Sequence, residues 1–98
     1  MIAIVAMLTI KDGSQSEFEA VFNELAREVR ANEPGCQVYD LCRKRESTTE
    51  YVIVERYSDA DAVSHHMKTD YFRAASPKIG ACLDGRPTVG QYDVLATA

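Results

Sequence analysis

The chain has two histidines, and they are adjacent, His65 and His66. They lie in a segment with helical periodicity, in which successive residues are turned by about 100°. His66 therefore shares a face with Val63 and Met67, whereas His65 points away, so we expect His66 to face the interior. A neutral imidazole near pH 7 can accept the proton of a phenol, which makes His66 a predicted general base. The alternative is a buried histidine hydrogen-bonded to a backbone carbonyl.

Glu55 is the second candidate catalytic residue. Its neighbours on the same face of a predicted strand are apolar or aromatic: Tyr51, Ile53 and Tyr57. A carboxylate in such surroundings is costly unless it is paired or protonated. We expect Glu55 to hold His66 or a substrate hydroxyl. Alternatively, it pairs with an arginine such as Arg43 or Arg56 across a subunit interface.

Three tyrosines, Tyr39, Tyr51 and Tyr57, are predicted to line an aromatic pocket, where their hydroxyls can donate hydrogen bonds to a substrate. Packing without ligand contact is the alternative for all three. Tyr39 belongs to a strand expected over residues 36–43. Strict alternation along that strand puts Cys36 on the opposite face from Tyr39.

No residue pattern predicts a metal or an organic cofactor. The two histidines are adjacent, whereas two helical ligands of one metal need a spacing such as i, i+4. No phosphate loop or dinucleotide fingerprint occurs, and the three cysteines contain no C-x-x-C pair. Cys36 and Cys42 would lie roughly 20 Å apart on one strand, too far for a disulfide. We therefore expect the purified protein to hold no metal, flavin or haem.

The elements that position these residues follow the order strand, helix, strand, strand, helix, strand. They are a strand over residues 1–10, a helix capped by Ser14 or Ser16 and stopped by Glu33-Pro34-Gly35, strands over 36–43 and 50–57, a helix capped by Ser58, a further helical stretch kinked or restarted at Pro77, and a strand over 88–95. This order predicts an α+β, ferredoxin-like βαββαβ fold with one four-stranded antiparallel sheet.

The first and third strands are apolar on both faces, although helices can cover only one side of such a sheet. The simplest way to bury the other side is to pack it against the same sheet of a second copy of the chain. The sequence therefore predicts a homodimer formed through the sheet face.

Length and charge narrow the class of protein further. Residues 1–98 are enough for one domain, with a net charge of −4. Arg43-Lys44-Arg45 is the only basic cluster and falls in a predicted hairpin turn, so no nucleic-acid partner is expected. The apolar first ten residues are too short to span a membrane and lack the basic lead of a signal peptide. We expect a cytoplasmic protein without a membrane partner.

Several segments together resemble the antibiotic biosynthesis monooxygenase family. They are Glu33-Pro34-Gly35-Cys36 followed by Tyr39, the strand Tyr51-Val52-Ile53-Val54-Glu55-Arg56-Tyr57, the stretch Ala62-Val63-Ser64-His65-His66-Met67, and Tyr71-Phe72. The resemblance covers roughly residues 2–95. It implies a ferredoxin-like domain that pairs into a dimeric α+β barrel.

The resemblance also implies a chemistry. Members of the family include monooxygenases that oxidise quinols or polycyclic phenols with O₂ and without metal or flavin. For this chain we expect a small hydroxylated aromatic or quinol as substrate, with His66 as base and Phe72 as a further substrate contact. An isomerase that uses the same cleft, or a non-catalytic dimeric binding or stress-response module, is the alternative. An enzyme should keep a cavity with His66 inside it, whereas a binding module would fill that space.

Haem degradation, another activity of the family, does not fit this chain. That branch uses an asparagine on the first strand, a tryptophan and a later helical histidine. The corresponding places hold Ala6 or Met7, Tyr57 and about Ser76, and the chain has no tryptophan.

Overall fold

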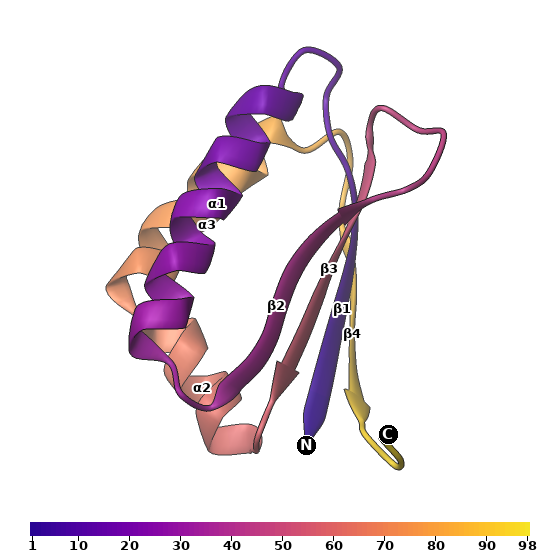
Figure 1. The fold of residues 1–98 in the computed structure, drawn as a ribbon. Coiled ribbons are helices and arrows are strands. Elements are labelled where there is room, and N and C mark those ends of the chain that lie inside the picture. The colour runs from indigo at the N-terminus through magenta and orange to yellow at the C-terminus, as the bar shows by residue number, and fades with distance from the viewer.

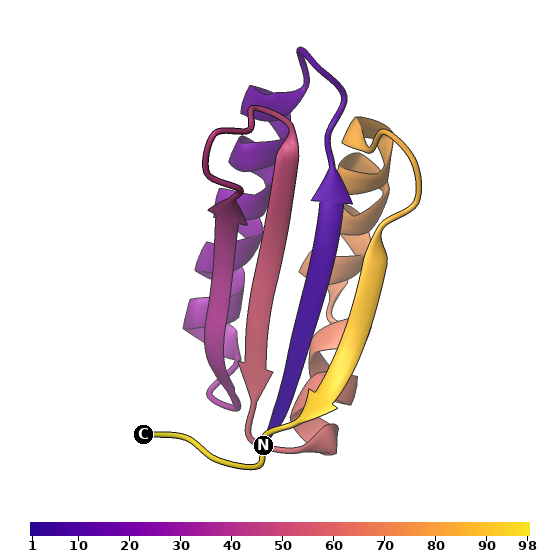
Figure 2. The same cartoon turned by 90° about the vertical axis from the view of Figure 1, so that its right-hand side faces the viewer.

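A computed structural model describes all residues, 1–98, as four strands and three helices (Figure 1). The elements are β1 (Ile2–Thr9), α1 (Gln15–Asn32), β2 (Cys36–Arg43), β3 (Glu50–Tyr57), α2 (Ala60–Lys68), α3 (Asp70–Cys82) and β4 (Thr88–Asp93). The order is βαββααβ, because the second helical region is two helices that meet at Thr69. Both chain ends lie at the same end of the sheet (Figure 2).

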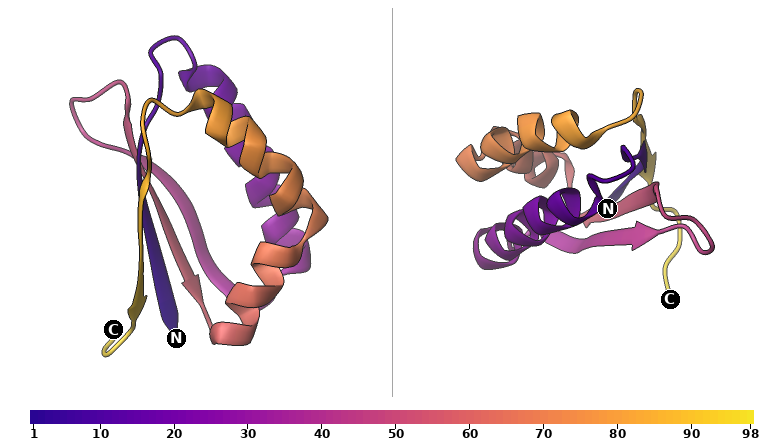
Figure 3. Two further views of the ribbon diagram at one scale, coloured as in Figure 1. Left: turned by 180° about the vertical axis from the view of Figure 1, so that it is seen from behind. Right: turned by 90° about the horizontal axis from the view of Figure 1, so that it is seen from above.

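The strands form one antiparallel sheet in the order β2-β3-β1-β4 (Figure 2). All three helices cover the same face of that sheet, which gives two layers (Figure 3). The predicted ferredoxin-like fold is confirmed. Along β1, the burial alternates as expected for a strand with one covered face: Ile4, Ala6 and Leu8 are buried against the helices.

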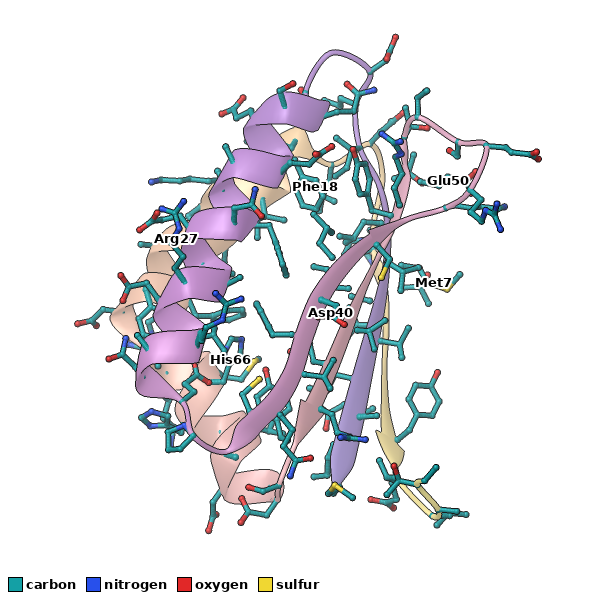
Figure 4. All side chains as sticks on the ribbon, in the orientation of Figure 1. Met7, Phe18, Arg27, Asp40, Glu50 and His66 are labelled. Atoms are coloured by element: carbon teal, nitrogen blue, oxygen red, sulfur yellow. The ribbon has the colours of Figure 1, made fainter.

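The other face of the sheet carries apolar side chains that no helix covers. Met7 on β1 and Tyr92 on β4 are 58% and 57% exposed, and Figure 4 shows Met7 on this outer side. Val5 pairs with Val54 across β1 and β3 in the same layer and is only half-buried. This surface is called the outer sheet face below.

Two of the predicted helix caps differ from the observed ones. Ser14 is the residue before α1, but its side chain makes no capping hydrogen bond, because its backbone is not extended (φ −101°, ψ 2°). The cap of α2 is Asp59 and not Ser58. The Asp59 backbone is extended, and its carboxylate accepts a hydrogen bond of 2.8 Å from the Ala62 backbone N–H.

The break between α2 and α3 lies at Thr69, and the later helix does not restart at Pro77. The Thr69 hydroxyl donates to the His66 carbonyl at 2.9 Å and accepts from the Phe72 backbone N–H at 3.3 Å. Pro77 lies inside α3, which continues to Cys82. One threonine therefore ends the helix of His66 and starts the helix of Phe72, which fixes these two side chains relative to each other.

A bulge at the start of β2 changes which residues face the helices. Cys36 pairs with Tyr57, whereas Tyr39 pairs with Glu55, so the segment contains one residue more than regular pairing allows. The prediction that Cys36 and Tyr39 lie on opposite faces was wrong, since the bulge turns both toward the helices. Tyr39 then stacks on Phe22 of α1, with ring centroids 5.1 Å apart.

Candidate active site

A cavity of about 320 Å³ lies between the inner face of the sheet and the helices α2 and α3. Most of its lining is apolar, and the chief contributors are Ile4, Leu25, Ile53, Phe72, Ile79 and Leu83. The polar side chains at its wall are Tyr39, Glu55, His66, Ser76 and Gln91. An apolar cavity of this size with a few convergent polar groups is typical of a small-molecule site.

His66 is the most deeply buried polar residue at this cavity, with 2% of its surface exposed. Figure 4 shows it between the helices and the sheet. Its Nδ1 lies 3.0 Å from both carboxylate oxygens of Glu33. Its Nε2 is buried and has no hydrogen-bond partner in the protein. As predicted, His65 on the same helix is exposed.

Glu33, the partner of His66, is itself 4% exposed. It is the residue that follows α1, and its second oxygen also accepts a hydrogen bond from the Tyr71 hydroxyl of α3. Burial, followed by the hydrogen bond to Glu33, raises the pKa of Tyr71, so this hydroxyl stays a donor. The buried carboxylate is thus held by an imidazole and a phenol from two different helices.

The turn after Glu33 packs directly onto α2. The Gly35 carbonyl accepts a hydrogen bond of 2.9 Å from the Ser58 backbone N–H. A Cβ atom at Gly35 would lie 2.8 Å from the Cβ of Ala62, so only glycine allows this approach. The Glu33-Pro34-Gly35 segment is therefore more than a helix stop, because it docks Glu33 against the helix that carries His66.

Glu33 was not among the predicted site residues, although one signal was available. An acidic residue at the C-terminal end of a helix faces the negative end of the helix dipole, where a carboxylate is unfavourable. A glutamate in that position suggests a specific partner. The partner itself is 33 residues away along the chain and cannot be read from local periodicity.

Glu55 lies on β3 and faces the helices, with 9% of its surface exposed. Its Oε1 accepts a hydrogen bond of 2.6 Å from the Tyr57 hydroxyl, and no protein donor contacts its Oε2. Burial raises the pKa of Glu55, whereas the bond from Tyr57 and the nearby His66 act in the opposite direction. Glu55 is therefore a partly satisfied carboxyl group at the cavity wall.

The predicted alternatives for Glu55 can be compared with this geometry. The residue that holds His66 is Glu33, and not Glu55. Arg56 follows Glu55 on β3 and therefore points to the opposite face, where its guanidinium donates to Gln37 at 3.0 Å. Pairing of Glu55 with Arg43 or Arg56 across an interface on the outer sheet face is excluded, because Glu55 points to the helices.

Three aromatic rings surround the imidazole of His66. The ring centroids of Phe72, Tyr39 and Tyr57 lie 4.6, 5.2 and 5.6 Å from that of His66. Phe72 and Tyr39 also line the cavity, whereas Tyr57 is fully buried behind Glu55. Burial raises the pKa of Tyr39 and of Tyr57, so both hydroxyls remain protonated donors.

Tyr57 and Tyr51 are the predicted pocket residues that do not line the cavity, and of these two it is Tyr51 that also lies away from His66. Its hydroxyl donates to Glu19 of α1 at 2.6 Å, and its ring meets Phe18 edge-on at 5.0 Å. It does not line the cavity of His66. Tyr51 and Tyr57 share a strand face, as predicted, but they lie at opposite ends of β3.

The remaining titratable residues give no second reactive centre. No three side chains of the metal-binding types lie close enough together to hold a metal ion. Burial, followed by the charges of Glu33 and Glu55, raises the pKa of the Cys36 thiol to about 11, so it is not a thiolate nucleophile at neutral pH. None of the helices is long and apolar enough to cross a membrane.

Comparison with known proteins adds a family and several similar folds. The family model described as "Antibiotic biosynthesis monooxygenase" matches residues 1–78. A candidate antibiotic biosynthesis monooxygenase from Caulobacter crescentus is 41% identical, with a TM-score of 0.92 over 97% of this chain and 90% of that one. No curated protein matches the chain in sequence.

Two further similar structures share less sequence identity with this chain. SnoaB from Streptomyces nogalater, described as a cofactor-independent oxygenase, is 25% identical, with a TM-score of 0.85 over 98% of this chain and 94% of that one. A conserved protein from Methanosarcina mazei, also 25% identical, has a TM-score of 0.87 over 93% and 89% of the two chains.

Proposed function

Because the chain belongs to the antibiotic biosynthesis monooxygenase family, we propose that it is a cofactor-independent monooxygenase that oxidises a small hydroxylated aromatic compound or quinol with O₂. The observation that carries this proposal is the buried Nε2 of His66, which has no protein partner and belongs to a side chain that lines an apolar cavity. A buried polar atom without a partner needs an explanation, and a non-catalytic module was expected to fill this space with side chains.

The proposed reaction begins with proton transfer. Nε2 of His66 takes the proton of a substrate hydroxyl, and the imidazolium that forms is stabilised by Glu33 at 3.0 Å. The resulting phenolate gives one electron to O₂, and the radical pair combines to a peroxide on a ring carbon. The peroxide accepts the proton from the His66 imidazolium. Its outer oxygen then leaves as water together with the hydrogen of that ring carbon, and the inner oxygen becomes a carbonyl. A phenol and O₂ thus become a quinone and water.

Glu55 is proposed to contact a second oxygen of the substrate. Its Oε2 has no protein donor, and it lies at the same cavity as His66. Tyr39 and Phe72 supply flat apolar surface beside the imidazole, which suits an aromatic ring. Tyr57 acts behind Glu55 through their hydrogen bond and does not reach the cavity.

The functional unit is proposed to be a homodimer that buries the outer sheet face, as in a dimeric α+β barrel. The support is the apolar surface that one chain leaves uncovered, with Met7 and Tyr92 more than half exposed. An obligate interface of this kind would bury roughly 2,000 Å² or more in total.

Val5→Lys should dissociate the dimer and remove most of the stability. A monodisperse monomer of the unmodified protein at micromolar concentration in light scattering would contradict this proposal.

The enzymatic proposal is tested by O₂ uptake with a panel of quinols and hydroxyaromatic compounds, with a metal chelator present. A substrate found in this way is then used with two variants. His66→Ala should lower turnover roughly a hundredfold or more, the usual range for loss of a general base. High pH should partly restore this activity, because a phenol that ionises in solution no longer needs the imidazole. Equal turnover of His66→Ala and the unmodified enzyme would exclude His66 as the base.

A loss of fold must be separated from a loss of the base, because His66→Ala leaves Glu33 buried with one partner fewer. His66→Asn is the second variant, since an amide can still donate a hydrogen bond toward Glu33 but cannot act as a base. If His66 has only a structural role, activity per folded dimer stays unchanged in both variants. Melting temperature and O₂ uptake together distinguish the two roles.

A further inference from the structure

Glu33 and Tyr71 form a polar pair behind His66, on the side away from the cavity. We propose that Glu33, anchored by Tyr71, is a positioning residue that fixes His66 in the tautomer with the proton on Nδ1 and the lone pair of Nε2 at the cavity wall. This inference rests on the proposed function only for the role of Nε2 as a base. The tautomer itself is a property of the free protein.

The contacts of the neutral His66 ring favour one of its two tautomers. An ionised carboxylate can only accept hydrogen bonds, and both oxygens of Glu33 lie 3.0 Å from Nδ1. In the neutral imidazole, Nδ1 must therefore carry the proton, and Nε2 is left with its lone pair. In water, the neutral imidazole of histidine carries its proton mainly on Nε2. The protein thus holds His66 in the tautomer that is less favoured in solution.

Glu33 can play this role because its own position is fixed from three sides. The Tyr71 hydroxyl of α3 donates to one of its oxygens. The Gly35 carbonyl accepts from the Ser58 backbone N–H, and Gly35 packs against Ala62 of α2. The carboxylate is therefore held between the turn after α1 and the two helices that carry His66 and Tyr71. A carboxylate placed in this way orients the ring and stabilises the imidazolium that forms during proton transfer.

The other polar groups around the ring do not replace Glu33. The groups that face His66 from the packed elements are Glu33, Tyr71, Glu55, Tyr57 and Tyr39. Of these, only Glu33 makes a hydrogen bond with either ring nitrogen. Tyr57 donates to Glu55, and the Tyr39 ring is stacked on Phe22. The tautomer therefore depends on a single acceptor.

The test is ¹⁵N NMR of the unmodified, substrate-free protein labelled at histidine. The chain has two histidines, so the spectrum contains His66 and one exposed internal control, His65. In the neutral state, His66 should show a protonated Nδ1 and an unprotonated Nε2, whereas His65 should show the solution mixture. A protonated Nε2 on neutral His66 would overturn the proposal without any variant.

The cause is tested by Glu33→Met, which keeps the length of the side chain and removes the acceptor. The proton of His66 should move mainly to Nε2, and kcat should fall more than tenfold with a smaller change in KM. If Glu33→Met does not fold, Glu33→Asp withdraws the acceptor by about one methylene and should give a mixture of tautomers. Glu24→Gln removes an exposed carboxylate from α1, the helix that Glu33 follows, and should leave the His66 spectrum unchanged.

The two proposals fail in different ways. If the folded Glu33 variants keep the protonated Nδ1 of the unmodified protein, Glu33 does not position His66, whatever the enzyme oxidises. If the spectra change as expected but no hydroxyaromatic compound supports O₂ uptake, the positioning role stands and the monooxygenase proposal fails.

Discussion

Two tyrosine–glutamate hydrogen bonds of the same length, 2.6 Å, lie at opposite ends of the layer between helices and sheet. Tyr51 donates to Glu19 beside Phe18, and Tyr57 donates to Glu55 beside His66. Figure 4 shows Phe18 and His66 toward opposite ends of this layer. Glu19 is only half-buried on α1, whereas Glu55 is buried at the cavity wall. The same pair of residue types thus sits in two different environments.

The side chains packed around the two tyrosine–glutamate pairs also differ. At the Tyr51 end, Phe18, Ile10 and Cys82 are at most 2% exposed and form a continuous apolar cluster with Tyr51. The cavity extends along β1 from Ile4 to Leu8 and so touches part of that cluster, whereas the buried polar residues Glu33, Glu55 and His66 lie toward the Tyr57 end. The first pair lies at the edge of the apolar cluster, and neither of its residues lines the cavity. The second pair leaves one carboxylate oxygen without a protein donor, on a residue that lines the cavity.

The largest expected loss of stability comes from a substitution at the Tyr51 end of the layer. Phe18→Ala removes a fully buried ring from the main apolar cluster and should lower the free energy of unfolding by about 3–5 kcal/mol. Activity per folded molecule should stay close to that of the unmodified protein, because Phe18 does not line the cavity. Denaturant unfolding and O₂ uptake measure the two quantities. A loss of activity without a loss of stability would mean that the two ends are not separate in function.

A smaller effect is expected from the two tyrosines. Tyr57→Phe leaves the buried Glu55 carboxyl without a protein partner, which should cost about 1–3 kcal/mol. Tyr51→Phe should cost about 0.5–1 kcal/mol, because the half-buried Glu19 can bind water instead. The comparison uses the same substitution in the same strand, with urea unfolding as the measurement. Equal costs would show that burial does not distinguish the two pairs.

The burial of Glu55 should also make the stability of the protein depend on pH. Burial raises the pKa of this group above its ordinary value of 4.5. The folded state therefore holds the proton more tightly than the unfolded chain does, and stability is lost as the pH rises from about 4.5 through the folded pKa. Glu55→Gln removes this loss, so the variant should gain stability relative to the unmodified protein over that range.

Chemical unfolding of both proteins between pH 4 and 8 measures the difference. Glu19→Gln, which removes the charge of the carboxylate that Tyr51 contacts, is the matched control on α1. A stability difference between Glu55→Gln and the unmodified protein that stays flat over the whole range would contradict the role of burial at this carboxyl.

The sequence predicted the elements and the faces of side chains better than it predicted their partners. The inward direction of His66 and the outward direction of His65 follow from helical geometry, which is local. The bond between His66 and Glu33 joins residues 33 apart, and no periodicity encodes it. Regular alternation also failed at Cys36, where a bulge adds one residue to β2.

The misplacement of Tyr51 has a similar physical origin. A period of two residues assigns Tyr51 and Tyr57 to one strand face, and both do face the helices. The pattern does not show which part of the helix layer lies opposite each residue. That depends on how α1 and α3 pack across the sheet, which is decided by side chains far apart in sequence. The sequence therefore predicted the face of the sheet, and the structure was needed to find the cavity along it.

The smallest expected effect concerns His65, the residue next to the proposed base. It lies on the exposed side of α2, so His65→Ala should change the free energy of unfolding by no more than about 0.5 kcal/mol. O₂ uptake should also be unchanged, because His65 does not line the cavity. Since His65 and His66 share a helix and a residue type, His65→Ala controls for any general effect of losing an imidazole from α2. If His65→Ala lowered turnover as much as His66→Ala, the loss would come from α2 as a whole and not from a base at the cavity wall. Melting temperature and O₂ uptake measured on both variants, in one buffer and with one substrate, decide between these explanations.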